Sequence, residues 1–261
     1  MTNERMPQIE IHPGRDAMGA AAARWFQQSV ARGLQAKPRC RVIFGCAPSQ
    51  DEFFSHLIAE AKAAPELWRQ VEVFHMDDYV GLPDSHPQSF RSYLRAHFLN
   101  HVEVALFHPI RGEETVPSVE AARYAALLAR APIDVIGMGI GENGHIAFND
   151  PPVADFADPV LAKVVEMDDV CRQQQVNDGC FPNLSKVPRH AITITLPAFA
   201  RAGALCCTVP GPRKARAVHR TLQGPIGPAC PATLLRTHPR AALFLDAAAA
   251  SLLPAELTRR V

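Results

Sequence analysis

Short apolar segments alternate with segments of helical periodicity along most of this chain, and this alternation limits its fold more than any other feature. Near-continuous apolar strands separated by helices indicate an α/β protein, with a mostly parallel sheet covered by helices on both faces. The predicted strands are residues 41–44, 71–76, 133–138, 161–167, 191–196, 205–209 and 241–245, and the predicted helices are residues 15–34, 48–63, 89–98, 118–131 and 214–222, with a helical turn at 197–201.

Composition indicates a globular protein that works on small molecules. Hydrophobic residues make up 48% of the 261 residues, and no linker divides them, so we expect a single domain over residues 1–261. The net charge of +1 argues against nucleic acid or an anionic membrane as a partner. The first residues lack the apolar segment of a secretory signal, and no apolar run is long enough to span a bilayer. We therefore expect a soluble, cytoplasmic protein.

Cysteine usage fits reduced thiols. The seven cysteines are odd in number and form no CxxC pair. A disulfide framework and a zinc cluster are both disfavoured by this pattern. We expect no metal.

Four polar or glycine-rich stretches follow predicted strands. In an open parallel sheet, ligands bind at the carboxyl ends of the strands. We therefore expect these stretches to meet at one site: residues 45–49, 76–79, 139–150 and 210–214.

The glycines after the strand at 133–138 form a GxGxxG pattern, which is typical of dinucleotide-binding loops. The pattern consists of Gly139, Gly141 and Gly144. A dinucleotide loop needs a helix directly after it, whose N-terminus holds the pyrophosphate. Pro151 and Pro152 exclude a continuous helix there. We therefore predict no nucleotide site, and we interpret the glycines as lining a substrate pocket that admits a ligand close to His145.

His145 is a candidate catalytic residue, and its neighbours Asn143 and Asp150 are candidates for the same catalytic group. A carboxylate beside an imidazole orients the ring and suits it to proton transfer near neutral pH. The alternative is a structural histidine that caps a turn.

Asp77 and Asp78 follow the strand at 71–76 directly. A carboxylate at a confined strand end is partly desolvated, which makes it a better general base. One of the two acids, facing the pocket, is a candidate general base, and Asp78 is also a candidate for the substrate pocket. The alternative is that both acids are solvated or cap the next turn.

Three segments are candidates for binding an anion such as phosphate. Small residues at Gly45, Cys46 and Ala47 expose backbone amides between a strand and a helix. Lys214 stands at the start of a predicted helix, where its charge and the helix dipole act together. Arg172 lies in a polar stretch with no evident core role. A plain turn and surface cations are the alternatives.

Three motifs resemble those of the glucosamine-6-phosphate deaminases. The segments FHMDDYVG at 74–81 and HPQS at 86–89 are similar to that family's MDEYVGL…HPxS, and GIGENGHIAFND at 139–150 is similar to its GxGxDGHIAFNE. The segment VPGPRK at 209–214 is similar to its late glycine-plus-lysine segment. The motifs occur in the family's order across most of the chain.

The resemblance implies a Rossmann-like fold without a nucleotide or other cofactor. It also implies conversion of glucosamine 6-phosphate to fructose 6-phosphate and ammonia. Asp77 matches the base that moves the C2 proton to C1, and His145 matches the group that assists ring opening. Lys214, Arg172 and the loop from Gly45 match phosphate-binding positions. The family also implies a possible homo-oligomer, from monomer to hexamer.

Departures from the pattern leave the natural sugar open. Asn143 stands where the family has aspartate, and Asp150 stands where it has glutamate. Cys46 and Ala47 replace a glycine and a threonine, so a hydroxyl donor is lost. A 4-epimer such as galactosamine 6-phosphate is an alternative substrate. A 6-phosphogluconolactonase and a non-catalytic sugar-phosphate sensor are alternative functions.

Overall fold

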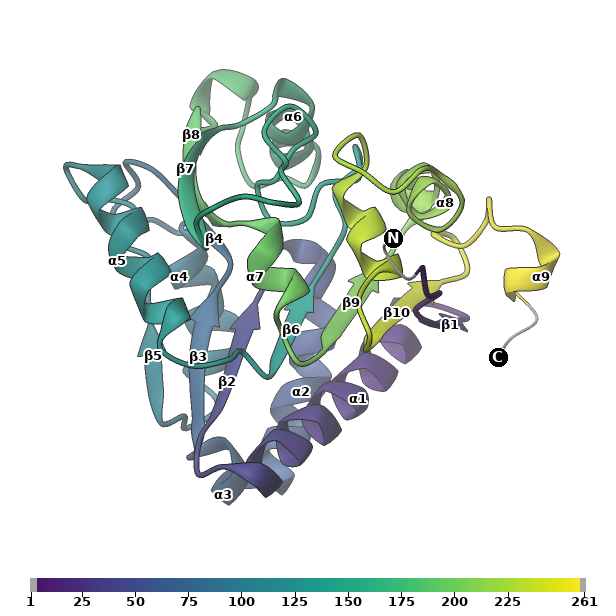
Figure 1. The fold of residues 1–261 in the computed structure, drawn as a ribbon, viewed down its shortest axis with the longest axis horizontal. Coiled ribbons are helices and arrows are strands. Elements are labelled where there is room, and N and C mark those ends of the chain that lie inside the picture. The colour runs from purple at the N-terminus through teal and green to yellow at the C-terminus, as the bar shows by residue number, and fades with distance from the viewer. Residues whose placement is uncertain (1–3, 259–261) are drawn as a thin grey trace.

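A seven-stranded, entirely parallel sheet forms the centre of the computed structural model, which describes residues 4–258 (Figure 1). The strand order is β1-β10-β9-β6-β2-β3-β5. The expected α/β class, with a mostly parallel sheet between helices, is confirmed. The strands are β1 (Gln8–His12), β2 (Cys40–Phe44), β3 (Val71–His75), β5 (Leu106–His108), β6 (Val135–Met138), β9 (Leu205–Val209) and β10 (Ala241–Asp246).

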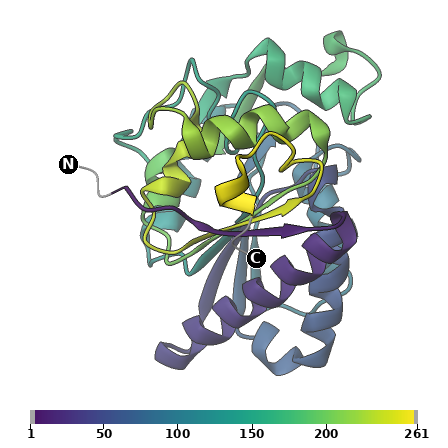
Figure 2. The same cartoon turned by 90° about the vertical axis from the view of Figure 1, so that its right-hand side faces the viewer.

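Helices cover both faces of this sheet. Strand β10 shows why, because Leu243 and Leu245 enter one buried cluster while Ala242 and Phe244 enter the other. Figure 2 shows β1 running across one side of the molecule, with α8 on one face and α1 on the other. One layer contains α1 (Arg15–Ala36), α2 (Asp51–Ala63), α3 (Pro65–Trp68), α4 (Phe90–Leu94) and a π-helical turn (Arg95–Leu99), and the other contains α5 (Pro117–Ala129), α7 (Leu196–Ala200), α8 (Ala215–Gln223) and a 3₁₀ helix (Pro231–Arg236).

A second, three-stranded sheet lies beyond the carboxyl ends of the main strands. It pairs β4 (Asp77–Tyr79), β8 (His190–Ile194) and β7 (Ala162–Glu166) in antiparallel fashion. Helix α6 (Asp169–Asn177) packs against it through a small apolar cluster that includes Tyr79 and Cys171. The predicted strands at 161–167 and 191–196 are thus confirmed. They belong to the small sheet and not to the seven-stranded one, because β8 pairs with β4 and β7.

The described chain also differs from the sequence-based expectations in smaller ways. Strands β1 and β5, at the two sheet edges, were not among the predicted strands. Each has only a short run of apolar residues, which gives a weak pattern. The predicted helix at 48–63 begins with a 3₁₀ turn (Pro48–Gln50), and the predicted helix at 89–98 ends in the π-helical turn. Further short elements are the 3₁₀ helices Leu184–Lys186 and Pro212–Lys214 and helix α9 (Ala255–Thr258).

The strand order reverses between β2 and β6. The chain leaves β2 toward β3 and β5 on one side, and leaves β6 toward β9 and β10 on the other. The loops after β2 and β6 therefore separate at the carboxyl edge and leave a crevice, which is where open α/β sheets bind ligands.

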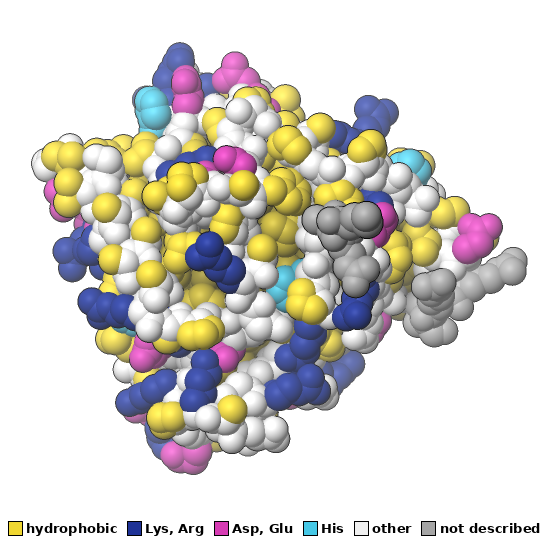
Figure 3. Space-filling model, in the orientation of Figure 1, with side chains coloured by type: hydrophobic (Ala, Val, Ile, Leu, Met, Phe, Trp, Pro, Cys, Tyr) yellow, Lys and Arg dark blue, Asp and Glu magenta, His cyan; other side chains and the backbone are white. Residues whose placement is uncertain are grey.

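Within residues 4–258, no helix has the length and apolar character to cross a membrane. Figure 3 shows basic side chains spread over one face, with fewer acidic side chains among them.

Candidate active site

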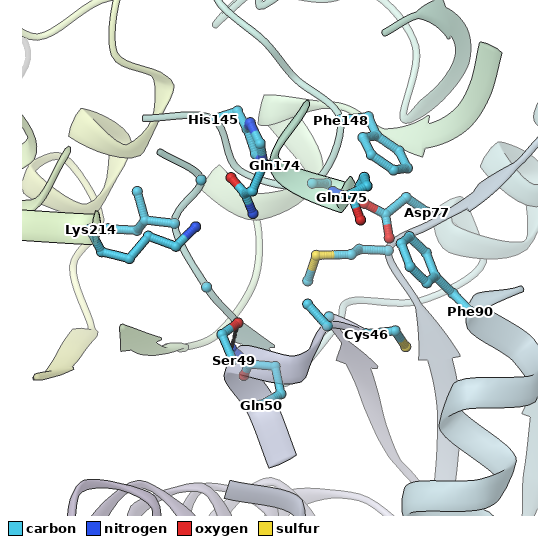
Figure 4. Close-up of a pocket in the computed structure, with 17 residues that line it drawn as sticks. Cys46, Ser49, Gln50, Asp77, Phe90, His145, Phe148, Gln174, Gln175 and Lys214 are labelled. Atoms are coloured by element: carbon cyan, nitrogen blue, oxygen red, sulfur yellow. Dashed lines mark hydrogen bonds between the residues drawn. The ribbon is translucent and has the colours of Figure 1, made fainter. Parts of the chain in front are cut away.

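The four polar or glycine-rich stretches that follow predicted strands all contribute residues to one pocket, as the sequence predicted (Figure 4). The pocket has a volume of about 70 Å³. Seventeen described residues line it: Gly45, Cys46, Ala47, Ser49, Gln50, Met76, Asp77, Phe90, Gly139, Ile140, Gly141, His145, Ala147, Phe148, Gln174, Gln175 and Lys214.

Asp77 is the acidic group of the pocket wall. It begins β4, directly beyond the end of β3, and it is only 5% exposed. Burial raises the pKa of the Asp77 carboxyl well above its ordinary range, and the negative charge of Asp78 raises that pKa further. A carboxylate with a raised pKa in an enclosed pocket is suited to take a proton from a bound molecule.

Asp78 points away from the pocket and is held by Arg91. Its carboxylate accepts hydrogen bonds from the Arg91 Nε at 2.8 Å and from the backbone N–H groups of Tyr79 and Phe90 at 2.9 and 3.1 Å. Burial raises the pKa of Asp78 to about 6, while these three donors act in the opposite direction. The structure does not bring Asp78 to the pocket surface, although its charge acts on Asp77.

His145 faces the pocket, with Asp150 and Asn143 behind it. Its Nδ1 lies 2.9 Å from Asp150 Oδ1, but the ring is turned so that no straight hydrogen bond forms. The Asn143 amide nitrogen donates to Asp150 Oδ1 at 2.9 Å, and the His145 backbone N–H donates to Asn143 Oδ1 at 2.9 Å. Asn143 thus ties the carboxylate to the backbone that carries the histidine.

Asp150 is fully buried and nevertheless charged. Burial opposes its ionisation, but His145, Asn143 and the backbone N–H of Asp168 outweigh burial and lower the pKa of Asp150. A buried, ionised carboxylate beside an imidazole can orient the ring and stabilise its protonated form.

Two glycines of the GxGxxG pattern serve His145 and the turn around it. A Cβ on Gly141 would lie 2.2–2.4 Å from three atoms of the His145 ring, so this position must lack a side chain. Gly144 has φ +92°, and a Cβ there would lie 2.6 Å from Cys230 Sγ. No helix follows the loop before α6, as Pro151 and Pro152 indicated. Gly139 and Gly141 line the pocket, whereas Gly144 lies outside it.

Lys214 is the cation of the pocket, and it projects into the cavity opposite Asp77 (Figure 4). It is 7% exposed, and burial lowers its pKa, although Asp178 and Glu142 oppose that shift. Among residues 4–258, no carboxylate lies within ion-pair distance of its ammonium group. A desolvated, unpaired lysine favours an anionic ligand.

The loop after β2 forms another wall. Gly45, Cys46 and Ala47 all line the pocket, as expected. In the described part of the chain, the backbone N–H groups of Cys46 and Ala47 have no hydrogen-bond partner. Ser49 and Gln50 add a hydroxyl and an amide that the sequence analysis did not assign to the site. The sequence feature that could have identified Ser49 and Gln50 is their position directly before a helix, where side chains turn toward the strand ends.

Helix α6 supplies two further pocket residues that the sequence analysis missed, Gln174 and Gln175. The Gln174 carbonyl accepts from the backbone N–H of Glu142 at 2.9 Å, and the Gln175 carbonyl accepts from the Tyr79 hydroxyl at 2.9 Å. Both amides are thus oriented by their oxygens. The Gln174 NH₂ group also donates to Asp178 Oδ2 at 3.4 Å, whereas the Gln175 NH₂ group is left for a ligand. Helical spacing from Cys171 was the available signal, because residues three and four apart share a face.

The structure does not bring Arg172 to this pocket. Its guanidinium bonds to Asp169 at 2.8 Å and to the carbonyl oxygens of Leu184 and Val187 at 2.8 and 3.1 Å. It faces the segment after α6 that contains Leu184 and Val187. The expectation that Arg172 binds phosphate has no geometric support here, because those oxygens already engage the end of its guanidinium group.

The chain belongs to the family of glucosamine-6-phosphate isomerases and 6-phosphogluconolactonases, whose family model matches residues 13–244. The resemblance noted in the sequence motifs is thereby confirmed.

One named relative and two solved structures illustrate what the chain is similar to. A glucosamine-6-phosphate deaminase of Exiguobacterium sibiricum is 35% identical over 73% of this chain and 74% of its own length. The solved structure of a monomeric glucosamine-6-phosphate deaminase is 25% identical, with a TM-score of 0.85 over 94% of this chain and 99% of its own. A 6-phosphogluconolactonase from Trypanosoma brucei, at 20% identity and a TM-score of 0.76 over 96% of this chain and 100% of its own, shares the fold.

Proposed function

We propose that this protein is an amino-sugar phosphate deaminase that converts glucosamine 6-phosphate, or an epimer of it, to a ketose 6-phosphate and ammonia. The observation that carries the proposal is the placement of Asp77 and Lys214 at opposite ends of one pocket, with His145 between them. An open-chain hexose phosphate carries its phosphate on C6 and reacts at C1 and C2. Its anionic group and its reacting carbons therefore lie at opposite ends, as Lys214 and Asp77 do in the pocket.

Lys214 and the free amides of the loop after β2 suit the phosphate end. The ammonium group has no competing carboxylate among the described residues, and the amides of Cys46 and Ala47 donate without a hydroxyl from position 47. Charge-assisted contacts to phosphate are about twice as strong as neutral ones. This arrangement compensates for the threonine that Ala47 replaces.

His145 suits the opening of the sugar ring. Opening requires proton transfer between the O1 hydroxyl and the ring oxygen O5, and an imidazole backed by the Asp150 carboxylate can relay that proton. Opening creates the C1 aldehyde, which makes the C2 proton acidic.

Asp77 suits the transfer from C2 to C1. Its carboxylate takes the C2 proton, and the electron pair of the broken C–H bond forms the C1–C2 double bond of an enolamine while the π electrons of the C1 carbonyl move to O1, which gains a proton. Returning the proton to C1 leaves a ketimine at C2. Water adds to the ketimine carbon, and ammonia departs as the C2 carbonyl forms. Burial raises the pKa of Asp77, which makes its carboxylate a stronger base for the C2 proton.

The test measures ammonia and fructose 6-phosphate from glucosamine 6-phosphate, with galactosamine 6-phosphate and 6-phosphogluconolactone run in parallel. We expect amino-sugar turnover that falls by about 10²–10⁴-fold in Asp77→Asn. Asp16→Asn, whose side chain is 87% exposed, is the matched control and should keep full activity. Lactone hydrolysis without ammonia release would favour a lactonase, and sugar-phosphate binding without turnover would favour a sensor.

The phosphate assignment has its own test. Lys214→Gln should raise KM for the sugar phosphate by at least ~10-fold, because a charge-assisted contact of this kind contributes about 1.5–3 kcal/mol. Lys186→Gln, at an exposed position, is the control. An unchanged KM in Lys214→Gln would contradict the assignment.

We also propose that the protein works in the cytoplasm. All seven cysteines are free in the structure, which is the usual state in a reducing compartment. A homo-oligomer is a further proposal, which the mass in solution tests.

A further inference from the structure

A fully buried ion pair lies directly behind the pocket, between Arg91 of α4 and Asp78 of β4. The Arg91 Nε donates to Asp78 Oδ2 at 2.8 Å, and the two side chains are 2% and 0% exposed, respectively. Taking two charges out of water is costly, so an apolar pair of similar volume is often equally stable or more stable. Stability alone therefore does not account for this pair.

Arg91 is held by partners from several segments. Its Nη1 contacts Glu113 Oε2, its Nη2 donates to the carbonyl oxygen of Leu82 at 2.9 Å, and its Nε lies 3.7 Å from Asp84 Oδ1. The side chains of Glu113 and Asp84 are each 47% exposed, so water screens their charges. Asp78 is the buried partner, and the charge of Arg91 acts on it with little screening.

The Asp78 carboxylate also fixes the backbone next to Asp77. Its Oδ1 accepts from the N–H groups of Tyr79 and Phe90 at 2.9 and 3.1 Å. Asp77 and Phe90 both line the pocket (Figure 4). Because successive side chains of a strand point to opposite faces, anchoring Asp78 on one face of β4 directs Asp77 into the pocket on the other.

Most of the other titratable groups packed around the two aspartates are uncharged. His75 of β3 bonds through Nδ1 to the Asp77 carbonyl oxygen at 2.9 Å, and burial lowers its pKa to about 3. Strand β8 places uncharged residues opposite both aspartates. Burial raises the pKa values of three further groups, which are therefore neutral: Cys46, Tyr79 and Cys171. His145 and Lys214 face Asp77 across the pocket, so the ion pair is the main charged feature on its buried side (Figure 4).

We propose that Arg91 is a positioning residue for the reaction: it holds Asp78 ionised and fixed behind the pocket, which keeps Asp77 a strong base aimed at the substrate. The inference rests on the proposed function, in which Asp77 takes the C2 proton. Burial and the negative charge of Asp78 both raise the pKa of Asp77. Burial also raises the pKa of Asp78 to about 6, and the charge of Arg91 acts against a further rise. Without Arg91, Asp78 takes up a proton at neutral pH, and its charge no longer acts on Asp77.

The first test follows the titration of Asp77 without any turnover, by thermal melts over a range of pH. A carboxyl with a raised pKa loses its contribution to stability as pH rises from its unfolded pKa to its folded pKa. The stability gained through Asp77→Asn therefore grows over that range and levels off near the folded pKa of Asp77. We expect the levelling pH to fall by about one unit when the gain is measured in an Asp78→Asn or Arg91→Met background.

Two further variants separate the charge of Arg91 from its packing. Arg91→Lys keeps a positive charge at this position and should keep the levelling pH close to that of the wild type. Arg95→Met is the matched control, because Arg95 pairs with Asp84 and should leave the levelling pH unchanged when it is removed. Should Arg91→Met fail to fold, Arg91→Gln replaces it, with the same expected fall.

The second measurement is the pH profile of kcat/KM on the amino sugar phosphate, whose acid limb reports the base of the free enzyme. In Asp78→Asn and Arg91→Met the acid limb should move to lower pH, and kcat should fall by about 3–10-fold because a weaker base takes the C2 proton more slowly. A wild type without turnover would contradict the proposed function alone, because the melts report Asp77 separately. A levelling pH that stays unchanged in Asp78→Asn, rises in Arg91→Met, or falls equally in Arg95→Met would overturn the inference.

Discussion

Asp77 has an environment that suits catalysis and opposes folding. Its carboxyl is buried, carries a raised pKa and lies next to the negative charge of Asp78. A buried group that must ionise to act as a base costs folding free energy, and active sites commonly contain such groups. The same carboxylate therefore has separate, measurable effects on activity and on stability.

Asp77→Asn should raise the stability of the protein while it removes activity. A carboxyl whose pKa is raised in the folded state contributes stability that is complete below its unfolded pKa and is lost as pH rises through the folded pKa. The uncharged amide does not suffer that loss. Thermal melts at several pH values should show the Asp77→Asn variant more stable than the wild type by about 0.5–2 kcal/mol at pH 7, with no gain near pH 3. A gain that is independent of pH would contradict this explanation.

Gly141→Ala should impair activity because the added methyl group would collide with the His145 ring. A catalytic group displaced by about 1 Å costs roughly 10²-fold in rate. Gly14→Ala is the matched control, since a Cβ at Gly14 meets nothing within 4 Å. Steady-state rates on the amino sugar phosphate measure the effect. Full activity in Gly141→Ala would show that the ring can move without loss.

At the scale of elements, α6 forms one wall of the pocket through Gln174 and Gln175. The bond from Glu142 N–H to Gln174 links α6 to the loop after β6 at the pocket.

Gln175→Leu should raise KM for the sugar phosphate by roughly 5–30-fold, the equivalent of about 1–2 kcal/mol for one hydrogen bond to a ligand. The Tyr79 hydroxyl orients the Gln175 amide so that its NH₂ group remains for the substrate. Gln173→Leu, two positions earlier on the exposed face of the same helix, is the control. Equal effects of the two substitutions on KM would contradict a substrate contact.

At the scale of the whole molecule, the first and last strands of the main sheet lie side by side. Residues 8–12 of β1 pair with residues 242–246 of β10 in parallel register. Ile9 packs into the same buried cluster as Leu243 and Leu245, and Gln8 on the same strand is exposed. The N-terminal segment thus completes a sheet whose centre holds the site.

Ile9→Asp should lower the free energy of unfolding by about 2–4 kcal/mol, because it places an unpaired charge against the core. Gln8→Asp introduces the same charge on the exposed side of β1 and should change stability little. Urea denaturation of both variants measures the difference. If Ile9→Asp were as stable as Gln8→Asp, β1 would contribute little to the core.

The sequence by itself determined the fold class and the convergence of the site. Apolar strands such as residues 205–209 bury both faces, and their alternation with helices is typical of a parallel sheet between helix layers. Parallel strands present all their carboxyl ends at one edge, so Asp77, His145 and Lys214 had to lie near one another. Pro151 and Pro152 excluded a nucleotide helix on local sterics alone.

Only the tertiary structure decided which polar residues face the pocket. Strand alternation sends Asp77 inward and Asp78 to Arg91, and the sequence does not mark which of the two adjacent acids points which way. Helix α6 has a polar sequence, so packing against β7 and β8 fixes its orientation, and that orientation sends Gln175 to the pocket and Arg172 away from it. Local patterns determine elements and sheet edges, whereas side-chain direction depends on contacts between segments far apart in the chain.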